Sequence, residues 1–124
     1  MSADSIRILA VDDHPMFREG LAMVLAIQQD MSVVAEASNG REAIQQFRHH
    51  RPDITLMDFR MPGMTGLEAM AAIRAEFPDA KIIILTTYET DVRDAVKMGA
   101  RACLLKTQWN TQVLGTIRAV HEGK

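Results

Sequence analysis

The sequence predicts an α/β fold: a doubly wound (βα)5 arrangement in which a mostly parallel sheet carries helices on both faces. Short apolar segments alternate five times with segments of helical spacing. Several of the apolar segments are apolar at consecutive positions and rich in β-branched residues, as in strands covered on both faces. Each parallel crossover between such strands needs a helix. The 124 residues suit one domain and contain no linker-like or repetitive segment.

The first half of the chain holds two strand and helix units. Residues 6–11 form the first apolar run, and Pro15 then stands where the first turn of a helix tolerates proline. The apolar residues of this helix fall at i, i+4, i+7 and i+8: Phe17, Leu21, Val24 and Leu25. A short run at 33–35 predicts the second strand. The helix at 40–48 has one apolar face, and Pro52 stops it.

The second half alternates in the same way. Its expected strands are 54–57, 82–85 and 102–105. The helix between the first two begins near Thr65 and ends before Pro78. The next helix covers 89–97, with Gly99 just past its end as a C-terminal stop. A last helix is expected over 110–122.

Composition and charge exclude several classes of protein. The 14 Lys and Arg residues against 16 Asp and Glu residues give a net charge of −2, so this domain is not expected to contact nucleic acid itself. The single cysteine cannot form an internal disulfide framework and fits a reducing, cytoplasmic location. The longest apolar runs, 21–27 and 82–85, are far shorter than the roughly 20 residues of a membrane span. No membrane partner is expected.

Polar side chains follow four of the expected strands where those strands end. They are Asp12 and Asp13 after the first, Asp58 after the third, Thr86 after the fourth and Lys106 after the fifth. The carboxyl ends of parallel strands share one edge of the sheet, where such folds bind ligands. Three carboxylates would repel one another there without a cation. Mg²⁺ fits best, because it takes hard oxygen ligands and leaves room for phosphate oxygens.

Asp58 is the candidate nucleophile. A free carboxylate beside such a metal ion can attack a phosphorus centre and form an aspartyl phosphate. The Lys106 ammonium and the Thr86 hydroxyl would stabilise the phosphoryl oxygens in the transition state. Taken singly, Asp12 or Asp13 would be read as a helix N-cap. The combination at four strand ends is what supports the phosphoryl-transfer hypothesis.

The four histidines do not predict a further metal site, because none has a partner at the spacing of zinc ligands. His14 is expected to be a surface residue at the start of the first helix. His49 and His50 lie in the basic end of the second helix, where positive charge complements the helix dipole. Trp109 is expected to be partly buried against the helix at 89–97, with anchoring of a partner contact as the alternative.

The same residues carry a resemblance to a known family. Residues 11–21 read VDDHPMFREGL, residues 58–66 read DFRMPGMTG and residues 85–91 read LTTYETD, with Lys106 further on. Together they resemble the receiver domain of bacterial two-component response regulators, most closely the NarL/FixJ (LuxR-type) subfamily. The resemblance covers nearly the whole chain, so a receiver domain would span 1–124. It implies a flavodoxin-like, CheY-like fold with strand order 2-1-3-4-5.

The resemblance also implies a phosphoryl acceptor and a metal site. Asp58 would accept the phosphoryl group from a phosphohistidine of a sensor histidine kinase. Asp13, Asp58 and the backbone carbonyl of Arg60 would hold Mg²⁺, and Asp12 would act through water. The domain would be a regulatory phospho-acceptor and not an enzyme in the ordinary sense, since it would catalyse only its own phosphorylation and dephosphorylation.

Other positions would bind or tune the phosphoryl group. Thr86 would hydrogen-bond a phosphoryl oxygen, and Lys106 would pair with the phosphoryl group as a compact ammonium. Side chains that would tune the lifetime of the phosphate follow the acceptor and the threonine: Arg60, Thr87 and Tyr88.

One departure from the family pattern affects the switch. Receivers usually have Tyr, Phe or His three residues before this lysine, and their switch couples the threonine, here Thr86, to an inward swing of that ring. This chain has Cys103 at that position, which has no ring to swing. The alternative hypothesis is therefore a degenerate or stand-alone receiver that acts as a protein-interaction module. Thr107, where the subfamily commonly has Asp, is a smaller departure.

The output implied by the resemblance lies beyond this chain. Members of the subfamily usually continue into a LuxR-type helix-turn-helix domain, so phosphorylation is expected to promote a homodimer and control DNA binding by that appended domain. An enzyme or cofactor carrier of similar topology is disfavoured. Residues 12–15 read DDHP, where a flavodoxin needs a Ser/Thr/Gly-rich phosphate loop and a dinucleotide binder needs G-x-G-x-x-G.

Overall fold

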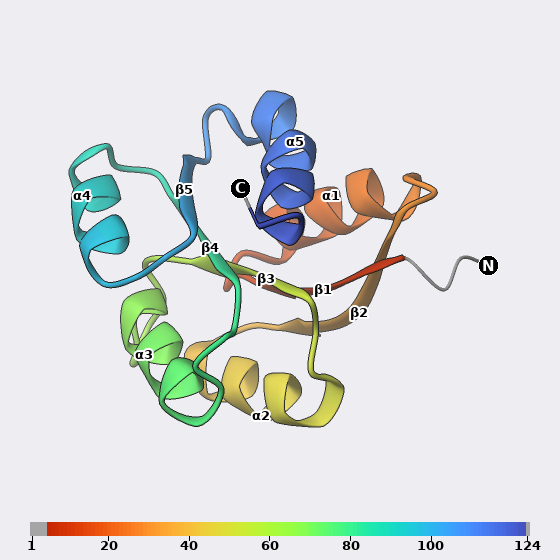
Figure 1. Ribbon diagram of the computed structural model, residues 1–124. Helices are drawn as coiled ribbons and strands as arrows, with labels where there is room; N and C mark the ends of the chain where they lie inside the picture. Colours follow the sequence, from red (N-terminus) through yellow and green to blue (C-terminus); the bar gives the residue numbers. More distant parts are fainter. Residues whose placement is uncertain (1–4, 124) are drawn as a thin grey trace.

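The sheet has five parallel strands in the order β2-β1-β3-β4-β5, as predicted (Figure 1). The structure is a computed structural model that describes residues 5–123, so residues 1–4 and 124 of the predicted domain lie outside it. The strands are β1 (Ile6–Val11), β2 (Met31–Ala37), β3 (Ile54–Asp58), β4 (Ile82–Thr86) and β5 (Ala102–Leu105). The helices are α1 (Pro15–Ala26), α2 (Gly40–His50), α3 (Gly66–Glu76), α4 (Thr90–Lys97) and α5 (Trp109–His121).

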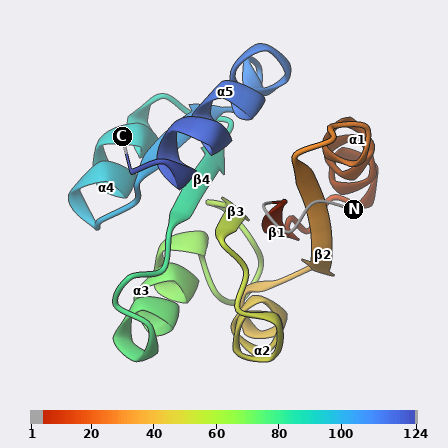
Figure 2. The same ribbon diagram turned by 45° about the vertical axis from the view of Figure 1, so that its right-hand side comes forward.

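Helices cover both faces of the sheet (Figures 1 and 2). α1 and α5 pack on one face through Leu21, Leu25, Val113, Ile117 and Val120. α2, α3 and α4 pack on the other through Ala43, Phe47, Ala69, Met70, Ile73 and Ala95. β3 and β4 are buried along their whole length, which fits their largely apolar sequences. Thr55 and Asp58 of β3 are the buried polar exceptions in that strand. Within residues 5–123, no helix combines the length and the apolar character that crossing a membrane requires.

The largest difference from the sequence prediction concerns β2. The strand covers Met31–Ala37, whereas the apolar run predicted only 33–35. β2 lies at the edge of the sheet and pairs with β1. An edge strand that is partly exposed accommodates polar residues such as Ser32 and Glu36, and these polar residues shorten the apolar signal. The predicted bounds of β1 and β5 match the structure, and the other predicted boundaries differ from it by at most two residues.

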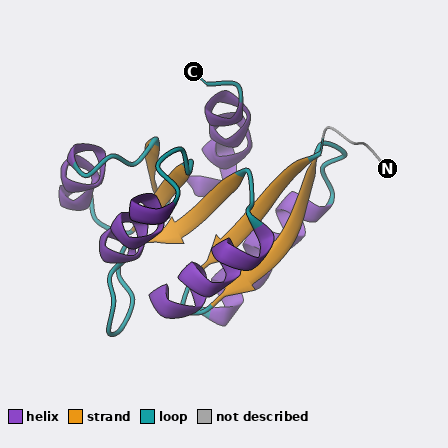
Figure 3. Cartoon of the chain, turned by 60° about the horizontal axis from the view of Figure 1, so that its bottom comes forward, coloured by secondary structure: helices purple, strands orange, loops and turns teal. Residues whose placement is uncertain are grey.

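The carboxyl ends of the strands share one edge, because all strands run in the same direction (Figure 3). Helix caps fix two of the loops at this edge. The Asn39 side chain accepts a hydrogen bond from Glu42 N at the start of α2, and Thr65 and Glu68 form a reciprocal capping box at the start of α3. Gly99, with φ at 101°, follows α4 as predicted.

Candidate functional site

The carboxyl edge of the sheet brings the predicted site residues together. Asp12 directly follows β1, Asp58 ends β3, Thr86 ends β4 and Lys106 directly follows β5. β3 lies between β1 and β4, so Asp58 is at the centre of the group. A cavity of about 220 Å³ is lined by His14, Asp58, Arg60, Thr86, Thr87, Tyr88 and Lys106. The cavity therefore includes the predicted acceptor, both predicted phosphoryl-binding side chains and all three predicted tuning positions.

Lys106 is held between two buried carboxylates. Its Nζ lies 2.7 Å from Asp12 Oδ2 and 3.3 Å from Asp58 Oδ1. Asp12 is 0% exposed and Asp58 is 3% exposed. One ammonium cannot neutralise both carboxylates together with the adjacent Asp13, so the site keeps an excess of negative charge.

Both burial and this excess charge affect the pKa of Asp58. Burial, and then the negative charge of Asp12, raise the pKa of Asp58 from 3.8 to about 7, although Lys106 opposes the shift. Without a further cation, Asp58 is thus only partly ionised at neutral pH. A divalent cation would favour the carboxylate form, which is the form that can attack phosphorus.

Two buried carboxylate oxygens are suited to a metal ion. Within the described chain, Asp13 Oδ1 and Asp58 Oδ2 are buried and have no hydrogen-bond partner. One ligand atom from each of Asp12, Asp13, His14 and Asp58 lies within 4.8 Å of the others. Buried oxygens without a hydrogen bond are costly, and hard oxygen ligands are those that Mg²⁺ prefers. The residues present therefore fit a Mg²⁺ ion.

His14 contributes more to this site than the sequence indicated. Its side chain is 67% exposed, as expected for a surface residue, but its Nδ1 lies 3.0 Å from Asp12 Oδ1 and 3.1 Å from Asp13 Oδ1. Its backbone N donates to Asp12 Oδ1 at 2.8 Å. The position of His14 directly after two site carboxylates was the signal that could have identified it.

Thr86 is hydrogen-bonded to a residue that the sequence did not single out. Thr86 Oγ1 donates to Asp91 Oδ2 at 2.7 Å. Asp91 is 3% exposed and also accepts from Arg60 Nε and Nη2, at 3.0 and 2.7 Å. Burial would raise the pKa of Asp91, but the hydrogen bonds from Arg60 and Thr86 outweigh it and hold that pKa below its ordinary value. Asp91 is therefore a buried, ionised carboxylate directly behind Thr86.

Cys103 is half-buried and is not part of the cavity. Burial, and secondly the negative charge of Asp91, raise the pKa of its thiol to about 11. The thiol is therefore neutral at physiological pH. It packs beside the apolar cluster under α2, α3 and α4 and behaves as a small apolar side chain.

Lys106 also contacts an aromatic ring of α1, on the face of the sheet that α1 and α5 cover. Its Nζ lies 4.5 Å from the centre of the Phe17 ring in α1. Phe17 in turn meets Trp109 edge to face, with ring centres 5.4 Å apart. The prediction that Trp109 packs against the helix at 89–97 was therefore wrong, because the aromatic partner on α1 determines where it packs. Trp109 is thus connected to Lys106 through the Phe17 ring.

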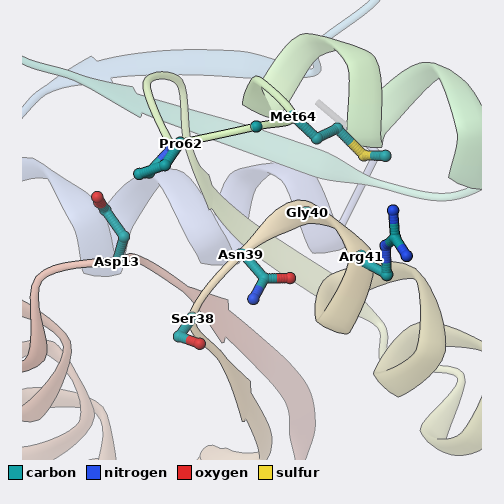
Figure 4. A pocket seen from close by; sticks show the side chains of 8 residues that line it. Asp13, Ser38, Asn39, Gly40, Arg41, Pro62 and Met64 are labelled. Carbon is teal, nitrogen blue, oxygen red and sulfur yellow. The ribbon is translucent and has the colours of Figure 1, made fainter.

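A second, larger pocket lies beside the site. It measures about 500 Å³ and is lined by Asp13, Ser38, Asn39, Gly40, Arg41, Pro62, Gly63 and Met64. Figure 4 shows Asp13 at one end of this pocket, with Pro62 above it. Asp58, Thr86 and Lys106 do not line this pocket. The smaller cavity, not this pocket, therefore contains the residues predicted for phosphoryl chemistry.

Gly66 allows α3 to start close to the acceptor. A Cβ at Gly66 would lie 2.1 Å from the backbone oxygen of Asp58, and Gly66 N donates to Phe59 O at 2.7 Å. We expect Gly66→Ala to lower the free energy of unfolding by about 2 kcal/mol, because the backbone around Asp58 has to move. Urea unfolding of the purified variant measures this change.

Gly20→Ala is the matched control for that substitution. Gly20 lies inside α1, and within residues 5–123 no heavy atom other than those of its chain neighbours and the nearby backbone of its own helix lies within 4 Å of a Cβ built there. Alanine is favoured over glycine in helix interiors, so Gly20→Ala should raise stability by about 0.5–1 kcal/mol. An equal loss of stability in both variants would contradict the proposed contact at Gly66.

Comparisons with known proteins show the family to which the chain belongs. Residues 8–118 match the response regulator receiver domain family. Oxygen regulatory protein NreC of Staphylococcus epidermidis is 39% identical over 122 residues, which cover 96% of this chain and 56% of that protein. Transcriptional regulatory protein LiaR of Bacillus subtilis is 42% identical over 121 residues, which cover 96% of this chain and 57% of that protein. The chain thus spans little more than half the length of these curated relatives.

Solved structures show the same similarity. The signal receiver domain of the response regulator NarL from Mycobacterium tuberculosis superposes with a TM-score of 0.90 at 32% identity, covering 98% of this chain and 99% of that chain. A LuxR-family two-component response regulator from Aurantimonas superposes with a TM-score of 0.92 at 34% identity, covering 97% of this chain and 87% of that chain. With its sheet order and its sequence motifs, the chain therefore belongs to the response regulator receiver domain family, in the NarL/FixJ (LuxR-type) subfamily.

Proposed function

We propose that this receiver domain accepts a phosphoryl group on Asp58, from the phosphohistidine of a sensor histidine kinase, in a Mg²⁺-dependent reaction. The observation that carries the proposal is the Asp58 carboxylate itself. It is buried, it lines a cavity of about 220 Å³, and among the described residues its Oδ2 has no hydrogen-bond partner. An oxygen that is free in this way can bind the metal ion, which leaves the other carboxylate oxygen of Asp58 to attack phosphorus.

The chain's own residues divide the chemistry between them. A carboxylate oxygen of Asp58 forms a bond to phosphorus while the bond from phosphorus to the donor imidazole nitrogen breaks, and the electron pair remains on that nitrogen. Lys106 and Thr86 bind phosphoryl oxygens and stabilise their charge. Asp13, Asp58 and the backbone carbonyl of Arg60 would hold Mg²⁺, with Asp12 acting through water. Bound Mg²⁺ supplies positive charge to the transferring phosphoryl group.

We further propose that phosphorylation controls a longer, cytoplasmic regulator. Relatives include a transcriptional regulatory protein and a DNA-binding response regulator of the LuxR family. The acidic balance of this chain, −2 overall, suits signalling to an appended DNA-binding domain better than direct contact with DNA. A phosphorylation-dependent homodimer would carry the signal to that domain.

A second candidate function rests on Cys103. Because this position has a thiol in place of a ring, the domain would accept phosphate yet act as an interaction module without the usual aromatic readout. The two candidates share the acceptor chemistry and differ only in how the domain responds to phosphorylation. Comparing the association state with and without Mg²⁺ and beryllofluoride separates them, because only the first candidate requires a change.

Incubation with acetyl phosphate tests the proposed chemistry. With Mg²⁺, the intact mass of the chain should increase by one phosphoryl group, and a chelator should prevent this increase. Asp79→Asn, which changes an exposed aspartate outside the site, should be phosphorylated like the unaltered chain. A phosphoryl adduct that forms equally well with the chelator would contradict the proposed role of Mg²⁺.

A further inference from the structure

The Thr86 hydroxyl donates its proton away from the position it would need to bind a phosphoryl group. Its Oγ1 donates to Asp91 Oδ2 at 2.7 Å and accepts from Tyr88 N at 3.2 Å. A hydroxyl has one O–H donor. Thr86 therefore cannot donate to a phosphoryl oxygen on Asp58 and keep its hydrogen bond to Asp91. A group on Asp58 that recruits this hydroxyl competes with Asp91.

Asp91 is held firmly in its place by Arg60. The guanidinium makes two hydrogen bonds to the carboxylate and lies 4.9 Å from the centre of the Tyr88 ring. Arg60 and Tyr88 both line the cavity over Asp58. The contacts that hold Asp91 therefore lie directly beside the position that a phosphoryl group would occupy.

Asp91 is also an anchor of α4. The helix is eight residues long, and Asp91 and Ala95 are its buried residues. Within the described chain, no side chain caps the N-terminus of α4 with a hydrogen bond. A short helix with few buried residues is readily displaced. A change at Asp91 thus acts directly on the first turn of α4.

We propose that Asp91 is a positioning residue that withholds the Thr86 hydroxyl from Asp58, and that its release transmits phosphorylation to α4. This inference rests on the proposed acceptor role of Asp58. When the cavity is filled, the hydroxyl turns to the phosphoryl oxygen, Asp91 loses that hydrogen bond, and the first turn of α4 shifts. The signal then needs no aromatic ring at Cys103.

The surroundings of residue 103 support this route. Burial, and secondly the charge of Asp91, raise the pKa of the Cys103 thiol, so the carboxylate lies close enough to act electrostatically on the position that has a ring in other receivers. Val96 and Met98, at and just beyond the end of α4, are 58% and 52% exposed. A shift of α4 therefore changes an exposed, partly apolar surface.

Binding of beryllofluoride, a phosphoryl mimic, tests this inference. In the presence of Mg²⁺, Asp91→Ala should lower the beryllofluoride concentration for half-saturation by about tenfold, because the competing acceptor of one charged hydrogen bond is removed. Asp91→Asn keeps the shape of the side chain. It should also lower the beryllofluoride concentration for half-saturation, but by less than Asp91→Ala does. Asp94→Ala, an exposed residue of the same helix, should stay within about twofold. NMR titration measures all three variants.

The proposal requires that the effect of Asp91→Ala on beryllofluoride binding depends on the Thr86 hydroxyl. Asp91→Ala also leaves Arg60 without its carboxylate, and this free cation alone could attract an anion. In a Thr86→Ala background, Asp91→Ala should therefore have no further effect on half-saturation, whereas attraction by Arg60 would persist. In addition, amide signals of residues 91–93 in the ligand-free Asp91→Ala variant should lie near the positions that beryllofluoride induces in the unaltered chain.

The outcomes separate this inference from the proposed function. If the unaltered chain shows no Mg²⁺-dependent beryllofluoride binding, the acceptor role of Asp58 itself is wrong. If binding is normal but Asp91→Asn, which preserves the side-chain volume, leaves both half-saturation and the α4 signals unchanged, the positioning role of Asp91 is wrong. An effect of Asp91→Ala that persists in the Thr86→Ala background also overturns it.

Discussion

Asp58→Asn should abolish phosphoryl acceptance and at the same time stabilise the metal-free fold. Burial and the charge of Asp12 raise the pKa of Asp58 from 3.8 to about 7, so ionising this side chain in the folded state is unfavourable. Above pH 7 the cost is at most about 4 kcal/mol, from 1.36 kcal/mol per pKa unit. An amide of the same shape avoids this cost and provides no nucleophile.

The sign of the pH dependence is set by the raised pKa. Protonated Asp58 stabilises the fold below about pH 4, and this contribution is lost as the pH rises through the folded pKa of about 7. The variant should therefore match the unaltered chain near pH 4 and exceed it increasingly up to about pH 7. Urea unfolding with a chelator, at a series of pH values, measures this difference.

Mg²⁺ should reduce the difference in stability between Asp58→Asn and the unaltered chain. A ligand that binds only the folded state raises the free energy of unfolding according to its concentration and affinity. The unaltered chain should gain more from Mg²⁺ than Asp58→Asn does, and the exposed control Asp79→Asn should behave like the unaltered chain. Lower stability of Asp58→Asn than of the unaltered chain at pH 8 without metal would contradict the electrostatic description of the site.

Lys106→Ala should slow phosphorylation by about 100-fold or more while Mg²⁺ binding is retained. The ammonium lies 2.7 Å from Asp12 Oδ2 and 3.3 Å from Asp58 Oδ1, where it can stabilise a phosphoryl oxygen, and loss of one such stabilising group typically costs 10²–10³ in rate, roughly. It is not a metal ligand. Acetyl phosphate kinetics and a Mg²⁺ titration measure the two properties separately.

The same substitution should destabilise the metal-free fold by about 3 kcal/mol, because it leaves buried carboxylates without their cation. Mg²⁺ should recover part of that loss. The emission of Trp109 is a convenient probe, since Phe17 contacts both Trp109 and Lys106. Lys97→Ala, an exposed lysine in α4, is the control. Complete loss of Mg²⁺ binding in Lys106→Ala, or an unaltered phosphorylation rate, would contradict the role assigned to this lysine.

Residue types at strand ends predicted the positions of Asp12, Asp58, Thr86 and Lys106. That inference succeeded because parallel strands place their carboxyl ends at one edge whatever the packing of the helices. The predicted length of β2 was wrong, because at the edge of the sheet the local sequence does not determine where a strand ends. An edge strand has no continuous apolar run, so its ends depend on pairing with β1 and leave little trace in the sequence.

Contacts between distant residues could not be predicted in this way. Asp91 looks like an ordinary acidic residue in the first turn of a helix, and only the fold places it against Thr86 and Arg60. Likewise, nothing in the local sequence indicates that Trp109 packs against Phe17. Local pattern thus predicted the residues that are proposed to react, and only the fold revealed the contacts of Asp91 with Thr86 and Arg60.

The position of the phosphoryl group tests the central claim most directly. After phosphorylation with acetyl phosphate and Mg²⁺, borohydride reduces an aspartyl phosphate to homoserine, and peptide mass spectrometry then identifies the modified residue. We predict that the reduced residue is Asp58 and that no other residue is modified in a Mg²⁺-dependent manner. Modification of Asp12 or Asp13, or an adduct on His14 in place of Asp58, would contradict the assignment of the acceptor.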